Sequence, residues 1–137
     1  MFNQNFRLTQ SVRIRTGVII IVLIALMHIF RIGSYLTGNL YSLYYSYASD
    51  IIMPFGIYFL LCINQLYIKF LQKWYVKAAI LIGLTSLVEL LQFFGIYALG
   101  ITFDPVDILA YIAGVGLAVF FDRLVLSKLM KTWDLEE

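Results

Sequence analysis

Hydrophobic residues fall into four long blocks, at about residues 14–30, 50–68, 76–97 and 105–126. A helix needs roughly 20 mostly apolar residues to cross about 30 Å of hydrocarbon. The second and third blocks are apolar nearly all round, which is typical of helices surrounded by lipid or protein rather than of soluble amphipathic helices. The pattern therefore predicts an all-α fold, an integral membrane bundle of four transmembrane helices.

The composition agrees with this prediction. Hydrophobic residues make up 62% of the 137-residue chain and charged residues 13%, whereas an average soluble domain is roughly half apolar and a quarter charged. The sequence has no internal repeat, no low-complexity tract and no linker long enough to separate two domains. We therefore expect one transmembrane domain over residues 1–137.

The first block has a second interpretation. Arg7, Arg13 and Arg15 precede the apolar run "GVIIIVLIALMHIF", as in the basic and apolar regions of a secretory signal peptide. However, Arg31 follows the run directly, and no small-x-small cleavage site stands at its end. We therefore expect the block to remain as the first membrane span.

The positions of the basic residues predict the orientation. Basic residues favour the cytoplasmic side of short loops, and nine of the ten flank the predicted spans on one side of the membrane, with Arg31 alone on the other. This predicts a multi-pass protein of the bacterial cytoplasmic membrane with both termini in the cytoplasm. Residues 31–49 and 98–104 would form outer loops. The charges form no separate basic domain, so we expect no nucleic-acid partner.

The outer segment 31–49 carries five tyrosines, which suit the membrane–water boundary as a passive aromatic belt. A lid over the outer mouth of the bundle is the alternative. At the end of this segment, Ser49 or Asp50 could cap the second helix. In "DPVD", Asp104 is expected to cap the fourth helix, with Pro105 at its first position.

Glu89 is the acidic residue that no helix cap explains. It lies about 18 Å along the third span from Lys77, at a depth where a charged side chain costs roughly 2.5–3.5 kcal/mol. Thr85, Ser86 and Gln92 share its helix face. We therefore expect Glu89 to face the bundle interior and to have a partner there.

The fourth span has a matching stripe. Small residues at every fourth position let helices approach closely, and the short connection makes spans three and four antiparallel neighbours. We expect the polar face of span three to meet the small face of span four, with the Tyr111 hydroxyl reaching Glu89. The stripe consists of Asp107, Ala110, Tyr111, Gly114 and Ala118.

No metal or cofactor site is predicted. Cys62 is the only cysteine and His28 the only histidine, so the sequence lacks a convergent ligand set. We interpret Cys62 as a small buried hydrophobic residue. Arg31, three residues after His28, either extends to the membrane interface or pairs with Asp50 or Asp107.

The stretch "VELLQFFGI" followed by "GITFDPVDILAYIAGVGLA" resembles the closing motif of the VanZ-like family of small bacterial membrane proteins, in particular a branch of unknown function. The shared pattern is an acidic residue three before Gln, a short loop, D-x-x-D, an aromatic residue and Gly. Asp50 also resembles the family's acidic residue at the start of its second span. The motif positions are Glu89, Gln92, Asp104, Asp107, Tyr111 and Gly114.

The sequence departs from the family pattern at three places. Ile101 and Thr102 stand where many members have an Arg, Pro54 lies near the position of a common His, and Tyr111 replaces a frequent Asn. VanZ-type proteins are linked to tolerance of teicoplanin-like glycopeptide antibiotics without an established reaction. The resemblance therefore implies an envelope function linked to antibiotic tolerance, and the missing Arg weakens that implication.

Four functions remain open. We favour a non-catalytic binding or envelope-modulating module that recognises an amphiphilic or lipid-linked small molecule, with membrane lipids as further partners. The alternatives are an intramembrane enzyme with Glu89 and Asp107 as acid and base, a small transporter or channel subunit formed by oligomerisation, and polar residues that only fix helix pairing. The sequence shows no nucleophile with its own base, which argues against catalysis. The expected binding residues are Asp50, Glu89, Gln92, Asp104, Asp107 and Tyr111.

Overall fold

The described part of the chain, residues 2–98, 103–131 and 133 of a computed structural model, is helical and contains no strand. Short 3₁₀ turns connect the long helices, and a π-helical segment follows the last one. The elements are α1 (Phe2–Ile29), η1 (Ile32–Tyr35), α2 (Asn39–Asn64), η2 (Lys69–Gln72), α3 (Trp74–Phe93), α4 (Pro105–Phe120), the π-helical η3 (Phe121–Leu126) and α5 (Ser127–Leu129).

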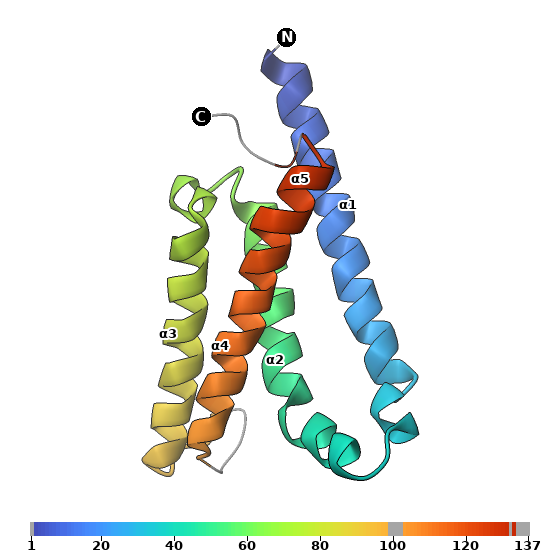
Figure 1. Ribbon diagram of the computed structural model, residues 1–137. Helices are drawn as coiled ribbons and strands as arrows, with labels where there is room; N and C mark the ends of the chain where they lie inside the picture. The colour runs from blue at the N-terminus through green and yellow to red at the C-terminus, as the bar shows by residue number, and fades with distance from the viewer. Residues whose placement is uncertain (1, 99–102, 132, 134–137) are drawn as a thin grey trace.

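Four helical segments are long and apolar enough to cross a membrane: Arg7–Ile29, Asn39–Asn64, Trp74–Phe93 and Pro105–Leu129. Successive long helices run in opposite directions, so that α1 begins and α5 ends at the same end of the bundle (Figure 1). The expectation of a helical bundle with four helices long and apolar enough to span a membrane is confirmed. The chain has the architecture of a multi-pass membrane protein.

The start of α2 differs from the expected boundary. The helix begins at Asn39, where the sequence predicted a loop up to Ser49. Gly38, with φ 61°, precedes the helix, and no proline or glycine interrupts the chain again until Pro54. Most of the tyrosine-rich segment is therefore helical. The expected cap at Ser49 or Asp50 is wrong, because both residues lie inside α2.

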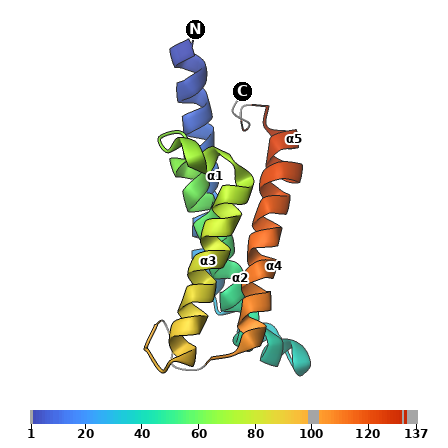
Figure 2. The same cartoon turned by 90° about the vertical axis from the view of Figure 1, so that its left-hand side faces the viewer.

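Pro54 lies in the interior of α2 and is buried. A helix capped by Ser49 or Asp50, as the sequence predicted, would have had Pro54 in its first turn. A proline has no backbone N–H, so it cannot donate to the carbonyl of Asp50 four residues earlier, and its ring clashes with that carbonyl. Both views show the first turns of α2 set at an angle to the rest of the helix (Figures 1 and 2). Pro54 accounts for this change of direction.

Helices α2 and α4 pack on each other more extensively than any other pair of elements, and their backbones approach closely at Gly114. A Cβ atom on Gly114 would lie 2.2 Å from the carbonyl oxygen of Ile51 and 2.9 Å from Cγ of Pro54. The expectation that the small stripe of α4 meets α3 is therefore corrected, since its central residue faces α2. The short connection makes α3 and α4 neighbours, but it does not determine which face of α4 is turned to α3.

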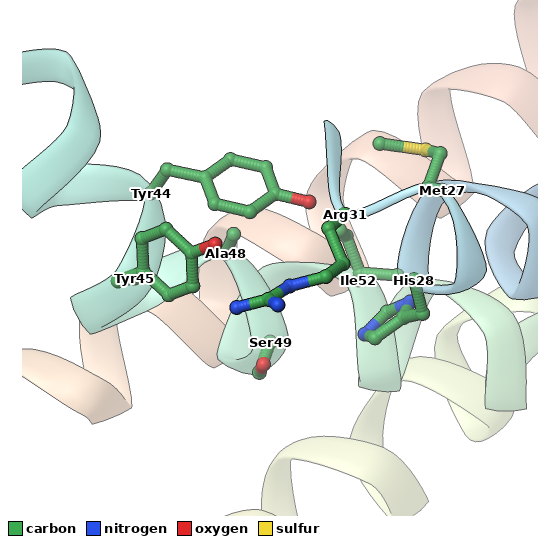
Figure 3. Close-up of a pocket in the computed structure, with 8 residues that line it drawn as sticks. All are labelled: Met27, His28, Arg31, Tyr44, Tyr45, Ala48, Ser49 and Ile52. Atoms are coloured by element: carbon green, nitrogen blue, oxygen red, sulfur yellow. The ribbon is translucent and has the colours of Figure 1, made fainter. Parts of the chain in front are cut away.

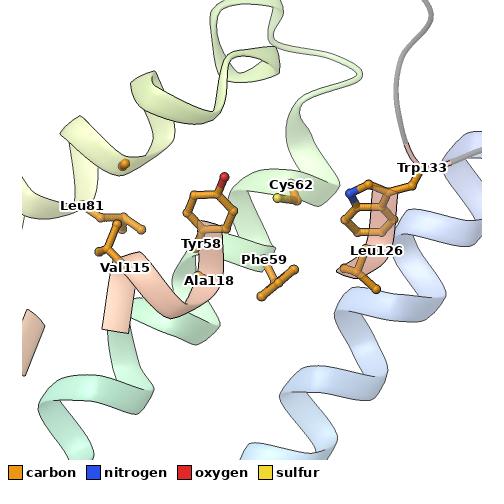
Figure 4. Packing of buried hydrophobic residues seen from close by; sticks show 9 residues of the cluster. Tyr58, Phe59, Cys62, Leu81, Val115, Ala118, Leu126 and Trp133 are labelled. Carbon is orange, nitrogen blue, oxygen red and sulfur yellow. The ribbon is translucent and has the colours of Figure 1, made fainter. Parts of the chain in front are cut away.

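The apolar core lies between α2, α3 and α4 (Figure 4). Tyr58, Phe59 and Cys62 of α2 are fully buried there. By contrast, only 11% of the α1 span is buried, compared with 33% of the α3 and α4 spans. Many large apolar side chains of α1 are consequently exposed, which leaves a surface suited to contact with lipid. The core seen in Figure 4 includes Tyr58, Phe59, Cys62, Leu81, Val115, Ala118, Leu126 and Trp133.

Replacing Gly114 with alanine should destabilise the bundle by about 1–3 kcal/mol, because the new methyl group meets backbone that cannot rotate away. Gly116→Ala is the matched control: nothing lies within 4 Å of its Cβ position. That control should be neutral or slightly stabilising, since alanine is the better helix former. Thermal unfolding of the two purified variants in detergent measures the difference, and equal melting temperatures would contradict the close approach.

Candidate functional site

The buried carboxyl group of Glu89 faces α4. Glu89 is 1% exposed, and its Oε1 atom accepts a hydrogen bond of 3.0 Å from the Tyr111 hydroxyl. The second carboxyl oxygen, Oε2, is buried without a hydrogen-bond partner among the described residues. A buried polar atom without a partner costs free energy. This oxygen is therefore the natural contact point for a group that enters from outside the described chain.

Two further carboxylates lie beside this pair, on α2 and α4. The Tyr111 hydroxyl is also within hydrogen-bonding reach of Asp50, and Asp50 interacts electrostatically with Glu89. Asp107 interacts with Asp50 and Glu89. Asp50 and Asp107 are both partly exposed. Three helices thus bring carboxyl groups around a single tyrosine. We call these four residues the acidic cluster (Asp50, Glu89, Asp107 and Tyr111).

The remaining two expected site residues are engaged in the connection between α3 and α4. Gln92 donates a hydrogen bond of 2.7 Å to the backbone carbonyl of Ala98. Asp104 accepts one of 2.9 Å from the backbone N–H of Val106, so its capping role is confirmed. Asp104 still adds negative charge near Asp50. Gln92 therefore ties the end of α3 to Ala98, and Asp104 caps the start of α4. Within the described residues, no hydrogen bond joins either of them to the acidic cluster.

Arg31 does not neutralise this charge. It is exposed, and the described chain shows no ion pair within 4 Å between it and Asp50 or Asp107. Of the two alternatives for Arg31, the pairing with Asp50 or Asp107 is therefore not formed. Its neighbour His28 contacts its own helix, with Nδ1 lying 2.9 Å from the carbonyl oxygen of Ile24. No three His, Cys, Asp or Glu side chains in the described residues come together as a metal site.

A second polar cluster lies at the opposite end of the bundle, where α1 begins. Lys77 and Asp122 form an ion pair with a 3.3 Å separation between Nζ and Oδ2. The same carboxylate accepts hydrogen bonds of 2.6 Å from the Tyr58 hydroxyl and 2.7 Å from the Trp133 indole N–H. Because each of these groups is buried, Asp122 ties α2, α3 and the segment after α5 together.

Further donors complete this cluster. The Lys77 ammonium donates a hydrogen bond of 2.6 Å to Gln65 and lies 3.2 Å from the Cys62 sulfur. The Arg13 guanidinium donates to the Trp133 carbonyl and stacks over the indole ring at 4.9 Å. Cys62 is buried as expected. We call this set the Asp122 cluster (Arg13, Tyr58, Gln65, Lys77, Asp122 and Trp133, with Cys62 beside the ammonium).

The sequence analysis missed the Asp122 cluster because it treated Arg13 and Lys77 as surface charges that flank spans. They are 2% and 1% exposed. A signal was nevertheless present, since Asp122 lies four residues beyond Ala118 and continues the every-fourth stripe of the fourth span. An acidic residue on an inward stripe of a membrane helix requires a partner on a neighbouring helix.

No family model, curated protein or solved structure matches this chain. Its function is therefore argued from the two polar clusters and the surfaces around them.

Asp122→Leu should destabilise the protein by about 3–5 kcal/mol, because it leaves the buried Lys77 ammonium without its counter-ion. The double variant Lys77→Met/Asp122→Leu should lose less than the sum of the two single variants, since neither charge is then left alone. Lys69→Met, at an exposed position, is the control and should leave stability unchanged. Thermal unfolding provides the measurement, and additive losses would show that the two charges do not interact.

Proposed function

We propose that the protein is a non-catalytic binding module of a bacterial cell envelope, and that its acidic cluster binds the cationic head group of an amphiphile. The observation that carries the proposal is the buried Oε2 atom of Glu89. It has no hydrogen-bond partner in the described part of the chain and lies beside the partly exposed carboxylates of Asp50 and Asp107. An ammonium group could donate to this oxygen while the two aspartates balance its charge.

The depth of the cluster supports an amphiphilic rather than a fully water-soluble ligand. Asp107 lies in the first turn of α4, and Glu89 lies four residues before the end of α3, so the carboxylates occupy one end region of the bundle. A head group there could remain near water while its apolar part lies along the lipid-facing helices. The VanZ-like resemblance fits this proposal, because that family is linked to tolerance of amphiphilic glycopeptides.

Catalysis by Glu89 and Asp107 has less support. The only described hydrogen-bond donor to Glu89 is the Tyr111 hydroxyl, and the two carboxyl groups belong to a shared concentration of negative charge. Transport of protons by a relay would need a continuous polar path across the bundle. Leu81, Val115 and Ala118 of the apolar core separate the acidic cluster from the Asp122 cluster. This apolar layer favours binding over transport across the bundle.

Substitution of Asp50 and Asp107 by asparagine should weaken binding of a primary-ammonium amphiphile about tenfold or more, because two charge-assisted contacts are lost. The probe is decylamine, with decanol as the uncharged comparison, and native mass spectrometry of the detergent-solubilised full chain measures the bound fraction. Asp104→Asn is the matched control, since asparagine also caps a helix. Equal retention of decylamine and decanol by the unaltered protein would refute cation recognition.

We also propose that both termini lie in the cytoplasm, which places the acidic cluster in the outer half of the bilayer. Seven of the nine basic residues on one side of the predicted spans are exposed. They lie in the first half of α1, in the connection between α2 and α3, and from η3 onward. Their exposed charges follow the positive-inside rule. Arg13 and Lys77 are buried and contribute through the Asp122 cluster instead.

Single-cysteine labelling tests this orientation. In a Cys62→Ala background, a membrane-impermeant maleimide added to intact cells should label Ser34→Cys, in η1, and should not label Lys128→Cys, in α5. Both positions are exposed, so protein burial cannot account for a difference. Permeabilised cells should show labelling of both. Labelling of Lys128→Cys alone in intact cells would reverse the orientation.

A further inference from the structure

A pocket of about 220 Å³ lies between the end of α1 and the first turns of α2 (Figure 3). Its polar lining consists of the guanidinium of Arg31, the imidazole of His28 and the hydroxyl groups of Ser49, Tyr44 and Tyr45. In Figure 3 the guanidinium points between Tyr45 and Ser49. This pocket is distinct from the acidic cluster, none of whose residues line it.

Local backbone geometry holds the pocket open. Arg31 adopts the left-handed conformation, with φ 47° and ψ 50°, and is the only residue other than glycine with a positive φ in the described chain. The turn after it is packed against α2, since a Cβ atom on Gly33 would lie 2.2 Å from the ring of Tyr44. An unfavourable backbone conformation persists only where the surrounding structure fixes it. The direction in which the Arg31 side chain leaves the backbone is therefore set by this turn.

The charge in the pocket is not compensated by the described chain. No carboxylate lies within 4 Å of the Arg31 guanidinium there. Asp50 follows Ser49 in sequence, but its carboxyl group interacts with Tyr111 and Glu89, because adjacent helical residues point about 100° apart. The pocket thus presents a positive group and several hydroxyl groups to an anion.

We propose that this pocket binds a phosphate group, and specifically the phosphate of a membrane amphiphile. A guanidinium binds phosphate oxygens through two parallel hydrogen bonds, and hydroxyl groups can donate to the remaining oxygens. Met27 and Ile52 form an apolar part of the lining, and large exposed apolar residues such as Leu23 and Leu26 continue along α1. This pairing of a cationic rim with an apolar helix surface suits an acyl-chain phosphate better than a free ion.

Native mass spectrometry of the detergent-solubilised full chain tests the proposal with three probes: dihexanoyl phosphatidic acid, dihexanoylglycerol and inorganic phosphate. The unaltered protein should retain phosphatidic acid about tenfold more than dihexanoylglycerol, which has the same chains without the phosphate. Excess inorganic phosphate should compete only weakly. Full competition by inorganic phosphate at equal concentration would identify free phosphate, rather than an amphiphile, as the ligand of this site. Equal retention of the two lipids would overturn the proposal.

Two variants localise the effect. Arg31→Gln removes the charge and should lower phosphatidic acid retention about tenfold, with Arg31→Lys intermediate because it keeps the charge without the bidentate geometry. Ser49→Leu fills the pocket without a change of charge and should lower retention similarly. The matched control is Arg15→Gln, at an exposed arginine about halfway along α1 that does not line the pocket. An equal loss in this control would show general charge attraction and would overturn the pocket. Decylamine binding should be unchanged in Arg31→Gln, which separates this site from the acidic cluster.

Discussion

The contact on which the rest of the structure depends is the approach of α4 to the backbone of α2 at Gly114. The position leaves no room for a side chain, because the carbonyl of Ile51 and the ring of Pro54 already occupy the space. Between helices in lipid, association relies on close packing and hydrogen bonds rather than on the hydrophobic effect. This one contact sets the spacing at which side chains of α2 and α4 can meet on either side of it.

Both polar clusters use that spacing. On one side, Tyr111 of α4 lies between Glu89 of α3 and Asp50 of α2. On the other side, Asp122 of η3 accepts a hydrogen bond from the hydroxyl of Tyr58 of α2. The two clusters nevertheless differ in kind. Each oxygen of Asp122 has a partner, which is the arrangement expected of a structural network. Glu89 keeps one buried oxygen without a hydrogen-bond partner among the described residues, and the proposed head-group contact would satisfy it.

Charge is also separated around α2. Its face toward α4 carries Asp50 within the acidic cluster, whereas its face toward α1 carries Ser49 beside Arg31. Groups of opposite charge therefore lie on two sides of α2, near one end of the bundle. The bend that Pro54 produces in α2 lies close to both sites.

The sequence by itself determined the four spans, because blocks of apolar residues the length of a bilayer have few other structural solutions. It also determined the cap at Asp104 and the pairing of Glu89 with Tyr111, since helical spacing and a short connection limit the partners available. Only the tertiary structure decided where α2 begins, which face of α4 meets α2, and that Lys77 and Arg13 are buried. Those features depend on packing between segments distant in sequence. A lysine at the end of an apolar block has the same local pattern whether it faces water or a buried aspartate.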